Sequence, residues 1–303
     1  VALGRGEDIT GIGNGNDYYT YVYDELPGVD VSEQVEENPE VRTKEEFYEL
    51  ENDVHLYDPE MLIHWFDWSQ DDVDEIHDRL APLFGNLIFR RSDDWHEHRY
   101  YTLYEAFEKV AEVFQEQERY NAFKELHDDY IGEITADLPD ESERPNAILS
   151  FAGDDEPEEF APTLFETGGT NIKHWRDLGV TDALADTDVE GFSSTNRQRI
   201  DYEKLLEVDP DVLLVRGHEA KTRAEFEDTV VAFMEQHPVA SDLSAVENER
   251  IFRGGPVYQG PIHNLFLTER GAQQLYPDVF GEIDSDRELF DRGRVAEIVN
   301  GGA

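Results

Sequence analysis

The chain has 303 residues, enough for two modest hydrophobic cores, and 39% of them are hydrophobic, which is too many for a disordered chain. It carries 71 acidic residues against 25 Lys and Arg, a formal charge of −46, which argues against a nucleic-acid partner because phosphate contacts need basic patches. Cysteine is absent, which excludes disulfides and thiolate metal sites, and no apolar run reaches the roughly 18 to 20 residues of a membrane-spanning helix.

The charge itself makes a prediction about the environment of the protein. The basic residues are 19 Arg and only 6 Lys, and the acidic residues are spread along the whole chain. Such a composition resembles that of proteins from extreme halophiles, in which molar salt shortens the Debye length to about 3 Å and like charges barely repel. The alternative, an acidic interaction tail, would concentrate the acids at one end. The sequence therefore predicts a halophilic protein.

The most informative feature is an internal repeat, in which residues 43–56 align with residues 201–214. Each copy begins with an N-cap residue, Thr43 or Asp201, and Thr43 has Glu46 three positions on, as in a capping box. A short amphipathic helix follows, then an acidic turn and a strand that starts at position 54 or 212. One helix–strand unit found twice, half the chain apart, predicts two similarly built α/β lobes.

Further strands are expected at residues 86–89, 147–151 and 250–253, each next to a helical pattern. This alternation favours doubly wound lobes with mainly parallel sheets. Between the lobes, apolar residues recur at helical spacing, and they predict one helix over residues 117–137 that is roughly 30 Å long and joins the lobes. These residues are Tyr120, Phe123, Leu126, Tyr130, Ile134 and Leu138.

The predicted organisation is an N-terminal α/β lobe over residues 1–100, a helical segment with the interlobe helix over 101–138, and a C-terminal α/β lobe over 139–303. Residues 1–4 are typical of the end of a helix that is already under way. We therefore expect the natural chain to begin before Val1.

Several motifs, taken in order, resemble the helical-backbone class of ABC-importer substrate-binding proteins. Residues 206–215 read Leu-Glu-Val-Asp-Pro-Asp-Val-Leu-Leu-Val and match the Leu-x-Pro-Asp motif of this class, which precedes a buried strand. Residues 50–54 are a looser copy with Asn52 in place of Pro, and residues 243–252 resemble a later helix–strand connection of the class. Residues 2–12 resemble the end of its first helix and its second strand, which implies that the first strand and most of the first helix of the N-terminal lobe precede Val1. The resemblance implies two Rossmann-like lobes joined by a single long helix, with a ligand cleft between them.

The resemblance also implies a function. Proteins of this class capture an iron–siderophore or a related chelate outside the cytoplasmic membrane and deliver it to an ABC permease with its ATPase subunits; cobalamin and haem are alternative ligands. The implied protein is no enzyme and is a lipoprotein held at the extracellular face of the membrane by a segment that precedes Val1. Together with the acidic composition, the expected source is a halophilic archaeon. In this class one surface glutamate on each lobe contacts permease arginines, and the matching positions are Glu45 and Glu203. Their alternative role is to stabilise a helix N-terminus.

Ligands of open α/β sheets bind beyond the carboxyl ends of the strands. The loops expected there span residues 58–68, 90–101, 153–163, 192–199, 216–218 and 254–263. They gather arginines, which suit carboxylate and catecholate oxygens, and aromatic residues, which supply flat contact area. The candidate ligand-binding residues are Trp65, Trp68, Arg90, Arg91, Trp95, Arg99, Tyr100, Arg197, Arg199, Arg216, His218, Tyr258 and His263. Each arginine could instead pair with one of the many acids.

Other chemistries have weaker support. His96-Glu-His98 places two imidazoles at strand spacing, but the sequence specifies no third metal ligand. No nucleophile elbow, phosphate-binding loop, zinc-protease motif or dinucleotide fingerprint is present, so no cofactor and no catalytic residue are predicted. An acidic α/β hydrolase and a surface adhesion module without a small ligand remain as alternatives.

Overall fold

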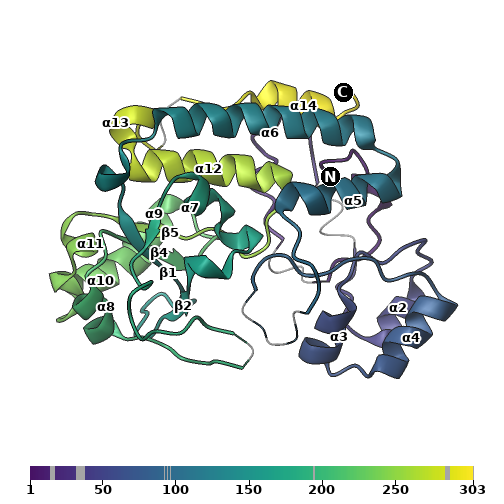
Figure 1. Ribbon diagram of the computed structural model, residues 1–303, viewed down its shortest axis with the longest axis horizontal. Coiled ribbons are helices and arrows are strands. Elements are labelled where there is room, and N and C mark those ends of the chain that lie inside the picture. Colours follow the sequence, from purple (N-terminus) through teal and green to yellow (C-terminus); the bar gives the residue numbers. More distant parts are fainter. Residues whose placement is uncertain are drawn as a thin grey trace. The chain divides into compact units, whose positions relative to one another are not determined.

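The computed structural model describes residues 1–13, 18–31, 38–91, 93, 95, 97–193, 195–283 and 287–302. The chain has a mixed α/β fold and divides into two compact units, each of which is discontinuous in sequence. Unit 1 comprises Val1–Ile88, Glu97–Phe123 and Arg292–Ala303. Unit 2 comprises Phe89–His96 and Lys124–Asp291. Figure 1 shows the chain coloured along its sequence, from purple at the N-terminus to yellow at the C-terminus.

The helix predicted between the lobes is confirmed as α6, Gln117–Asp137. Its first seven residues belong to unit 1 and the rest to unit 2, so the chain passes from one unit to the other inside a continuous helix. Its buried residues follow the predicted helical spacing, with one addition that the apolar pattern did not include, His127. The opposite side of the helix is exposed and acidic.

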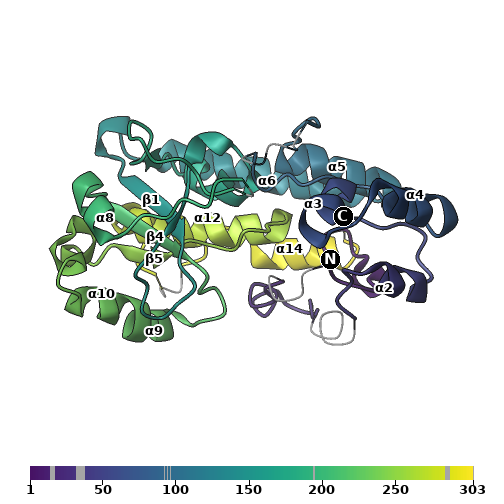
Figure 2. The same cartoon turned by 90° about the horizontal axis from the view of Figure 1, so that it is seen from below.

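Unit 2 is built on a sheet with the order β2-β1-β4-β5, in which β3 also pairs with β1. The central strands β1 (Asn146–Phe151), β4 (Val212–Arg216) and β5 (Ile251–Arg253) are parallel, as the sequence predicted. The short strands β2 (Ala161–Thr163, antiparallel) and β3 (Thr181–Asp182, parallel) share the outer edge of β1, one beside each half of it. Figure 2 shows β1, β4 and β5 side by side.

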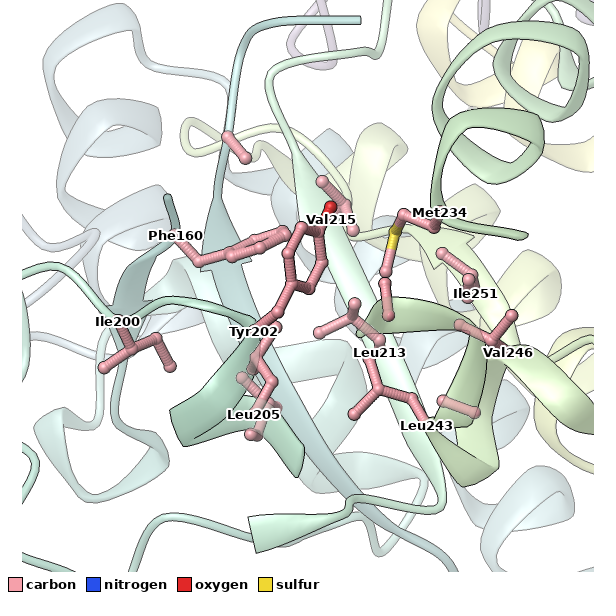
Figure 3. Packing of buried hydrophobic residues seen from close by; sticks show 14 of the residues in the cluster. Phe160, Ile200, Tyr202, Leu205, Leu213, Val215, Met234, Leu243, Val246 and Ile251 are labelled. Carbon is pink, nitrogen blue, oxygen red and sulfur yellow. The ribbon is translucent and has the colours of Figure 1, made fainter. Parts of the chain in front are cut away.

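Helices cover both faces of this sheet, as in a doubly wound fold. One face packs against α8 (Tyr202–Val208), α9 (Arg223–Phe226), α10 (Ala232–Gln236) and α11 (Ser244–Glu247), with a π-helical turn joining α9 to α10. Figure 3 shows Tyr202 and Leu205 of α8 and Met234 of α10 packed over Leu213 and Val215 of β4. Every residue of β4 is buried, which explains its continuous apolar sequence.

The second face is covered by α7 (Lys173–Asp177) and α12 (Pro261–Leu275), followed by α13 (Pro277–Phe280). Trp175 of α7 is fully buried, and its Nε1 donates to the carbonyl of Gly254 just after β5 (3.3 Å). Gly271 lets α12 approach α7, because a Cβ there would lie 2.7 Å from Leu178 and 2.9 Å from the Trp175 ring. The two helices therefore hold the end of β5 against the sheet.

Unit 1 is mainly helical in its described residues. Its helices are α2 (Lys44–Glu49), α3 (Pro59–Phe66), α4 (Gln70–Arg79), α5 (Leu103–Phe114), the start of α6, and α14 (Arg292–Val299). One hydrophobic cluster joins α2, α3 and α4 around Phe47, with the Trp68 ring edge-on at 5.2 Å. A second cluster joins α5 to α6 through Tyr104, Phe107, Tyr120 and Phe123.

The two repeat helices begin at the expected residues. Oε2 of Glu46 accepts from the backbone N–H of Thr43 (2.7 Å), as in the predicted capping box, and Oδ1 of Asp201 accepts from the N–H of Lys204 (3.0 Å). Phe47 and Leu205 occupy the same buried position in the two copies. Glu45 and Glu203 are each the second residue of their helix, and both are exposed.

Two strands predicted in the first half of the chain differ from the structure. One is wrong, and the other is present only as a single isolated bridge. The strand expected from position 54 is an isolated parallel bridge between His55 and Leu83. Residues 86–89 form no strand, because their backbone is bonded elsewhere: Leu87 N–H donates to the side chain of Asp58 (2.5 Å), and the Phe89 carbonyl accepts from Asn171. The apolar sequence of residues 86–89 indicated a strand, but their backbone groups are hydrogen-bonded to distant residues and not to a neighbouring strand.

Candidate functional site

The carboxyl ends of β1, β4 and β5 lie at one edge of the unit 2 sheet, because the three strands are parallel. The residues that follow them are Ala152 after β1, Gly217 after β4 and Gly254 after β5. We call this the carboxyl edge of unit 2. In open α/β sheets this is the edge at which ligands bind.

Arg216 ends β4 at this edge, but it is only 2% exposed. Its Nε donates to the carbonyls of Gly255 (3.1 Å) and Gly254 (3.4 Å), and its Nη2 donates to the carbonyl of Asn171. Burial lowers the pKa of Arg216 to about 10, and the nearby Glu219 opposes that shift. The guanidinium is thus satisfied by backbone oxygens and ties the end of β4 to the loop after β5 and to the segment around Asn171, so we withdraw Arg216 from the ligand set.

A buried ion pair lies beside Arg216. The carboxylate of Glu219, 1% exposed, receives Nη1 and Nη2 of Arg270 on α12 at 3.0 and 3.2 Å. Its Oε1 also accepts from the backbone N–H of Gly255 (2.9 Å), a residue at φ +84° where a side chain would be strained. Glu219 therefore ties the end of β4 both to α12 and to the loop after β5.

Asn171 and Gln259 form the centre of a polar network at the same edge. Nε2 of Gln259 lies 3.0 Å from the carbonyl of Asn171 and 3.3 Å from Nδ1 of His174. Burial, and then the positive Arg216, hold the pKa of His174 well below its usual range, so this imidazole is neutral. Nδ1 is its acceptor, and the Nε2–H has no partner among the residues that the structure describes.

The network continues from Gln259 to α6. Nδ2 of Asn264 donates to Oε1 of Gln259 (3.3 Å), and Nε2 of His127 donates to Oδ1 of Asn264 (2.9 Å). Burial lowers the pKa of His127 to about 4, with the positive Lys173 as the next cause. His127 is neutral at pH 7, so its burial costs far less than that of a charged group.

The candidate histidines of unit 2 are also buried. The ring of His218 packs 5.6 Å from that of Phe226, and burial lowers its pKa. His263 was expected in a loop, but the loop after β5 ends at Gly260 and His263 lies in the first turn of α12. In this structure both side chains belong to the interior of unit 2.

Arg197 and Arg199, in contrast, are exposed, and they flank one aromatic ring. Their guanidinium carbons lie 5.2 and 5.9 Å from the centre of the Phe192 ring. The turn that carries them is held by Ser193, whose N–H donates to the Asn196 carbonyl (2.8 Å). Phe192 N–H donates to the carbonyl of Pro162 in β2 (2.8 Å), which fixes the segment beside the sheet.

The segment before this sheet supplies further candidates. Nε and Nη2 of Arg90 pair with the buried carboxylate of Asp93 at 2.7 and 2.9 Å, so this arginine is neutralised. The ring of Tyr258 packs against Phe89, with 5.1 Å between centroids. Arg91 is exposed and Trp95 is half-buried. His96 lies outside the described residues, so the His96-Glu-His98 pattern has only His98 to place.

The candidates in unit 1 divide into core and surface. Trp65 is half-buried on α3, in a segment predicted as a loop. Trp68 belongs to the hydrophobic cluster, and its Nε1 donates to the Arg42 carbonyl (3.1 Å), so we withdraw it from the ligand set. Arg99 is exposed and paired with Glu105 (2.7 Å), and the Tyr100 ring stacks on His98 at 4.9 Å.

Two absences concern the described residues alone. They contain no group of three His, Asp or Glu side chains that could hold a metal ion. None of their helices has both the length and the apolar character to cross a membrane.

A comparison with protein-family models decides the family. The model described as periplasmic binding protein matches residues 53–258, which include the parallel strands β1, β4 and β5 and the second copy of the repeat. The chain belongs to the periplasmic binding protein family. A search of curated proteins found no match.

Solved structures of periplasmic binding proteins share the fold. The triscatecholate siderophore binding protein FeuA from Bacillus subtilis, solved with ferri-bacillibactin, has a TM-score of 0.55 at 12% identity over 93% of this chain and 90% of its own. An ABC transporter substrate-binding protein from Listeria monocytogenes has a TM-score of 0.56 at 13% identity over 85% and 95%. An ABC-type Fe3+-hydroxamate transport system protein from Saccharomonospora viridis has 0.52 at 16% identity over 77% and 72%.

Sequence reasoning about this periplasmic binding protein missed the residues that build the carboxyl edge of unit 2. They are His127, Asn171, His174, Glu219, Gln259, Asn264 and Arg270. His127 had a signal, because it follows Phe123 by four residues and precedes Tyr130 by three, which places it on the buried stripe. Glu219 had none, since one more glutamate in so acidic a chain carries no information.

Proposed function

We propose that the protein is the extracytoplasmic solute-binding component of an ABC importer and that it captures a ferric siderophore. The exposed arginines Arg197 and Arg199 carry this proposal. Neither has a carboxylate within 4 Å among the described residues, in a chain with almost three acids for each base. Two guanidiniums without a carboxylate partner in the described part of the chain, beside an aromatic ring, suit an anionic, flat ligand such as an iron catecholate.

The family and the fold support this reading. FeuA is described as a triscatecholate siderophore binding protein, and the protein from Saccharomonospora viridis as part of an Fe3+-hydroxamate transport system. Among the other candidate residues, Arg91, Trp95, Tyr258, Trp65, Arg99 and Tyr100 stay in the proposed ligand set, because each is exposed or half-buried. Arg90 is left out because its partner Asp93 is buried, whereas the partner of Arg99, Glu105, is exposed. Cobalamin and haem stay as alternative ligands within the same family.

The test is a titration with ferri-bacillibactin, a ferric hydroxamate, haem and cobalamin at one fixed molar salt concentration. The wild type is expected to bind a ferric siderophore, and the Arg197→Gln/Arg199→Gln variant to bind it about 100-fold more weakly. The reason is that hydrogen bonds to charged groups contribute about 1.5 to 3 kcal/mol each. Tryptophan fluorescence quenching gives both affinities.

The matched control is Arg79→Gln/Arg223→Gln, which removes two exposed arginines that are paired with Glu75 and Glu227. Its affinity should equal that of the wild type. Equal affinities for both double variants would contradict the role of Arg197 and Arg199, and binding of haem or cobalamin alone would select the alternative ligand.

We further propose that Glu45 and Glu203 dock the protein onto its permease, at the extracellular face of the membrane. Both are exposed at the second position of equivalent helices, and their caps use other side chains, Glu46 and Asp201. The Glu45→Gln/Glu203→Gln variant should keep its ligand affinity, while uptake through the cognate transporter in proteoliposomes falls at least tenfold. A buried, hydrogen-bonded interface charge pair costs several kcal/mol when one partner is truncated.

The repeat provides a control for docking as well. Glu49 and Glu207 are exposed, lie in the same two helices and are also related by the repeat offset. Glu49→Gln/Glu207→Gln removes the same charge and should leave uptake unchanged. If both pairs reduce uptake equally, charge alone explains the effect and the docking assignment is wrong.

A further inference from the structure

A short segment from the first half of the sequence is built into unit 2. Phe89 and Arg90 follow directly after residues of unit 1, yet they belong to unit 2. The Phe89 carbonyl accepts from the N–H of Asn171 (3.2 Å), and the Phe89 ring is buried edge-on against Tyr258, 5.1 Å between centroids. The segment is thus attached to the carboxyl edge by its backbone and by its side chain.

Gly169 makes this attachment possible. A Cβ at this position would lie 1.7 Å from the carbonyl oxygen of Phe89, 2.1 Å from its carbonyl carbon and 2.5 Å from the N of Arg90. The φ of Gly169 is −74°, a value that any residue adopts, so the backbone conformation does not require glycine here. The requirement comes from the close approach of the two backbones alone.

Asn171 connects this contact to Tyr258 by a second route. Its N–H binds Phe89, and its carbonyl accepts from Arg216 and from Nε2 of Gln259 (3.0 Å). Gln259 is the next residue after Tyr258. The Tyr258 backbone is therefore held through Gln259 and its ring through Phe89, and both routes depend on the segment around Gly169.

We propose that Gly169 is a positioning residue, which orders Tyr258 for ligand binding by letting Phe89 dock against residues 169–171. This inference rests on the proposed function, in which Tyr258 belongs to the ligand set. An ordered Tyr258 loses less conformational freedom when a ligand binds, so a smaller part of the binding free energy is offset by immobilising its side chain. Gly169 itself needs no contact with the ligand.

The first experiment measures affinity for ferri-bacillibactin in molar NaCl. Gly169→Ala is expected to bind about tenfold more weakly than the wild type. Phe89→Leu, which removes the ring and leaves the backbone unchanged, is expected to show a loss of similar size. The control is Gly132→Ala on α6, where an added Cβ meets no atom within 4 Å, and its affinity should be unchanged. Circular dichroism in the same buffer confirms that each variant is folded.

The second experiment observes Tyr258 without any ligand. A fluorotyrosine placed at position 258 should give a shifted 19F resonance in the wild type and in Gly132→Ala, and a sharper, solvent-like resonance in Gly169→Ala and Phe89→Leu. The Asn171 amide should exchange its hydrogen at least tenfold faster in Gly169→Ala, because its acceptor, the Phe89 carbonyl, is displaced.

The outcomes separate the two proposals. Unchanged 19F resonance and amide exchange in Gly169→Ala would overturn the positioning role, and so would altered spectra with wild-type affinity. If the wild type binds none of the chelates, the proposed function fails. The ligand-free spectra then still decide whether Gly169 orders Tyr258.

Discussion

Replacing Glu219 with Gln is expected to lower the free energy of unfolding by about 3 kcal/mol in molar NaCl. The glutamine keeps an oxygen for the Gly255 N–H but removes the negative charge that faces Arg270. Arg216 is fully buried nearby and also loses the opposing charge of Glu219. Removal of one partner of a buried ion pair is costly because the remaining charge stays desolvated. Urea denaturation at fixed salt measures the change.

The control for this prediction removes the same charge from an exposed pair. Glu297 pairs with Arg294 at 2.7 Å, but both side chains are at least 40% exposed, so Glu297→Gln should change stability by less than about 1 kcal/mol. The double variant Glu219→Gln/Arg270→Gln should recover part of the lost stability. A double-mutant coupling energy near zero would show that the pair contributes nothing beyond its single residues.

The sequence predicted the C-terminal half of the fold well because local and tertiary preferences agree there. The run of residues 212–215 is apolar throughout and lies between two parallel partners, β1 and β5. The long helix α6 was also predicted to the residue, since its buried stripe follows one regular spacing over 21 residues. Strand β4 and helix α6 are stabilised by the burial of apolar residues, and the spacing of these residues can be recognised in the sequence.

The first half was harder because its backbone groups are satisfied irregularly. Residues 86–89 have a strand-like sequence, but their backbone is hydrogen-bonded to the side chain of Asp58 and to the N–H of Asn171. Asp58 lies 29 residues away and Asn171 more than 80, and no local pattern indicates such partners. The assignment of residues 89–96 to unit 2 depends on the same long-range contacts, including the close approach at Gly169.

The loops at the carboxyl edge of the sheet could be predicted from the sequence, but the exposure of each side chain in them could not. Parallel strands carry their carboxyl ends to one edge, so the loops after β1, β4 and β5 could be named from sequence. Whether an arginine in such a loop faces solvent depends on its partners. Arg216 binds three backbone carbonyls and is buried, whereas Arg197 and Arg199 contact one aromatic ring and are exposed.

The stability of the whole protein is expected to fall steeply when the salt concentration is lowered. Even if each of the 25 basic residues paired with one acid, 71 − 25 = 46 acids would remain unpaired. At 0.1 M salt the Debye length is about 10 Å, so these charges repel over several residues, whereas at 1 M it is about 3 Å. Net charge far from zero destabilises the compact state through this repulsion. The melting temperature, followed by circular dichroism, should therefore drop markedly between 2 M and 0.1 M NaCl.

Helix α6 shows where part of this repulsion arises and offers a variant that tests it. Glu125, Asp129 and Glu133 are exposed and follow one another at four-residue spacing, which places like charges next to each other along the helix. Such pairs destabilise a helix by a few tenths of a kcal/mol each at low salt. Replacing them with Gln, Asn and Gln should raise the melting temperature in 0.1 M NaCl and change it little in 2 M NaCl. Sucrose at matched osmolality stabilises by exclusion from the protein surface and leaves the charges unscreened, so it should leave the difference between variant and wild type in 0.1 M NaCl unchanged. If the wild type melts at the same temperature in 0.1 M and 2 M NaCl, repulsion between surface acids is no major influence on its stability.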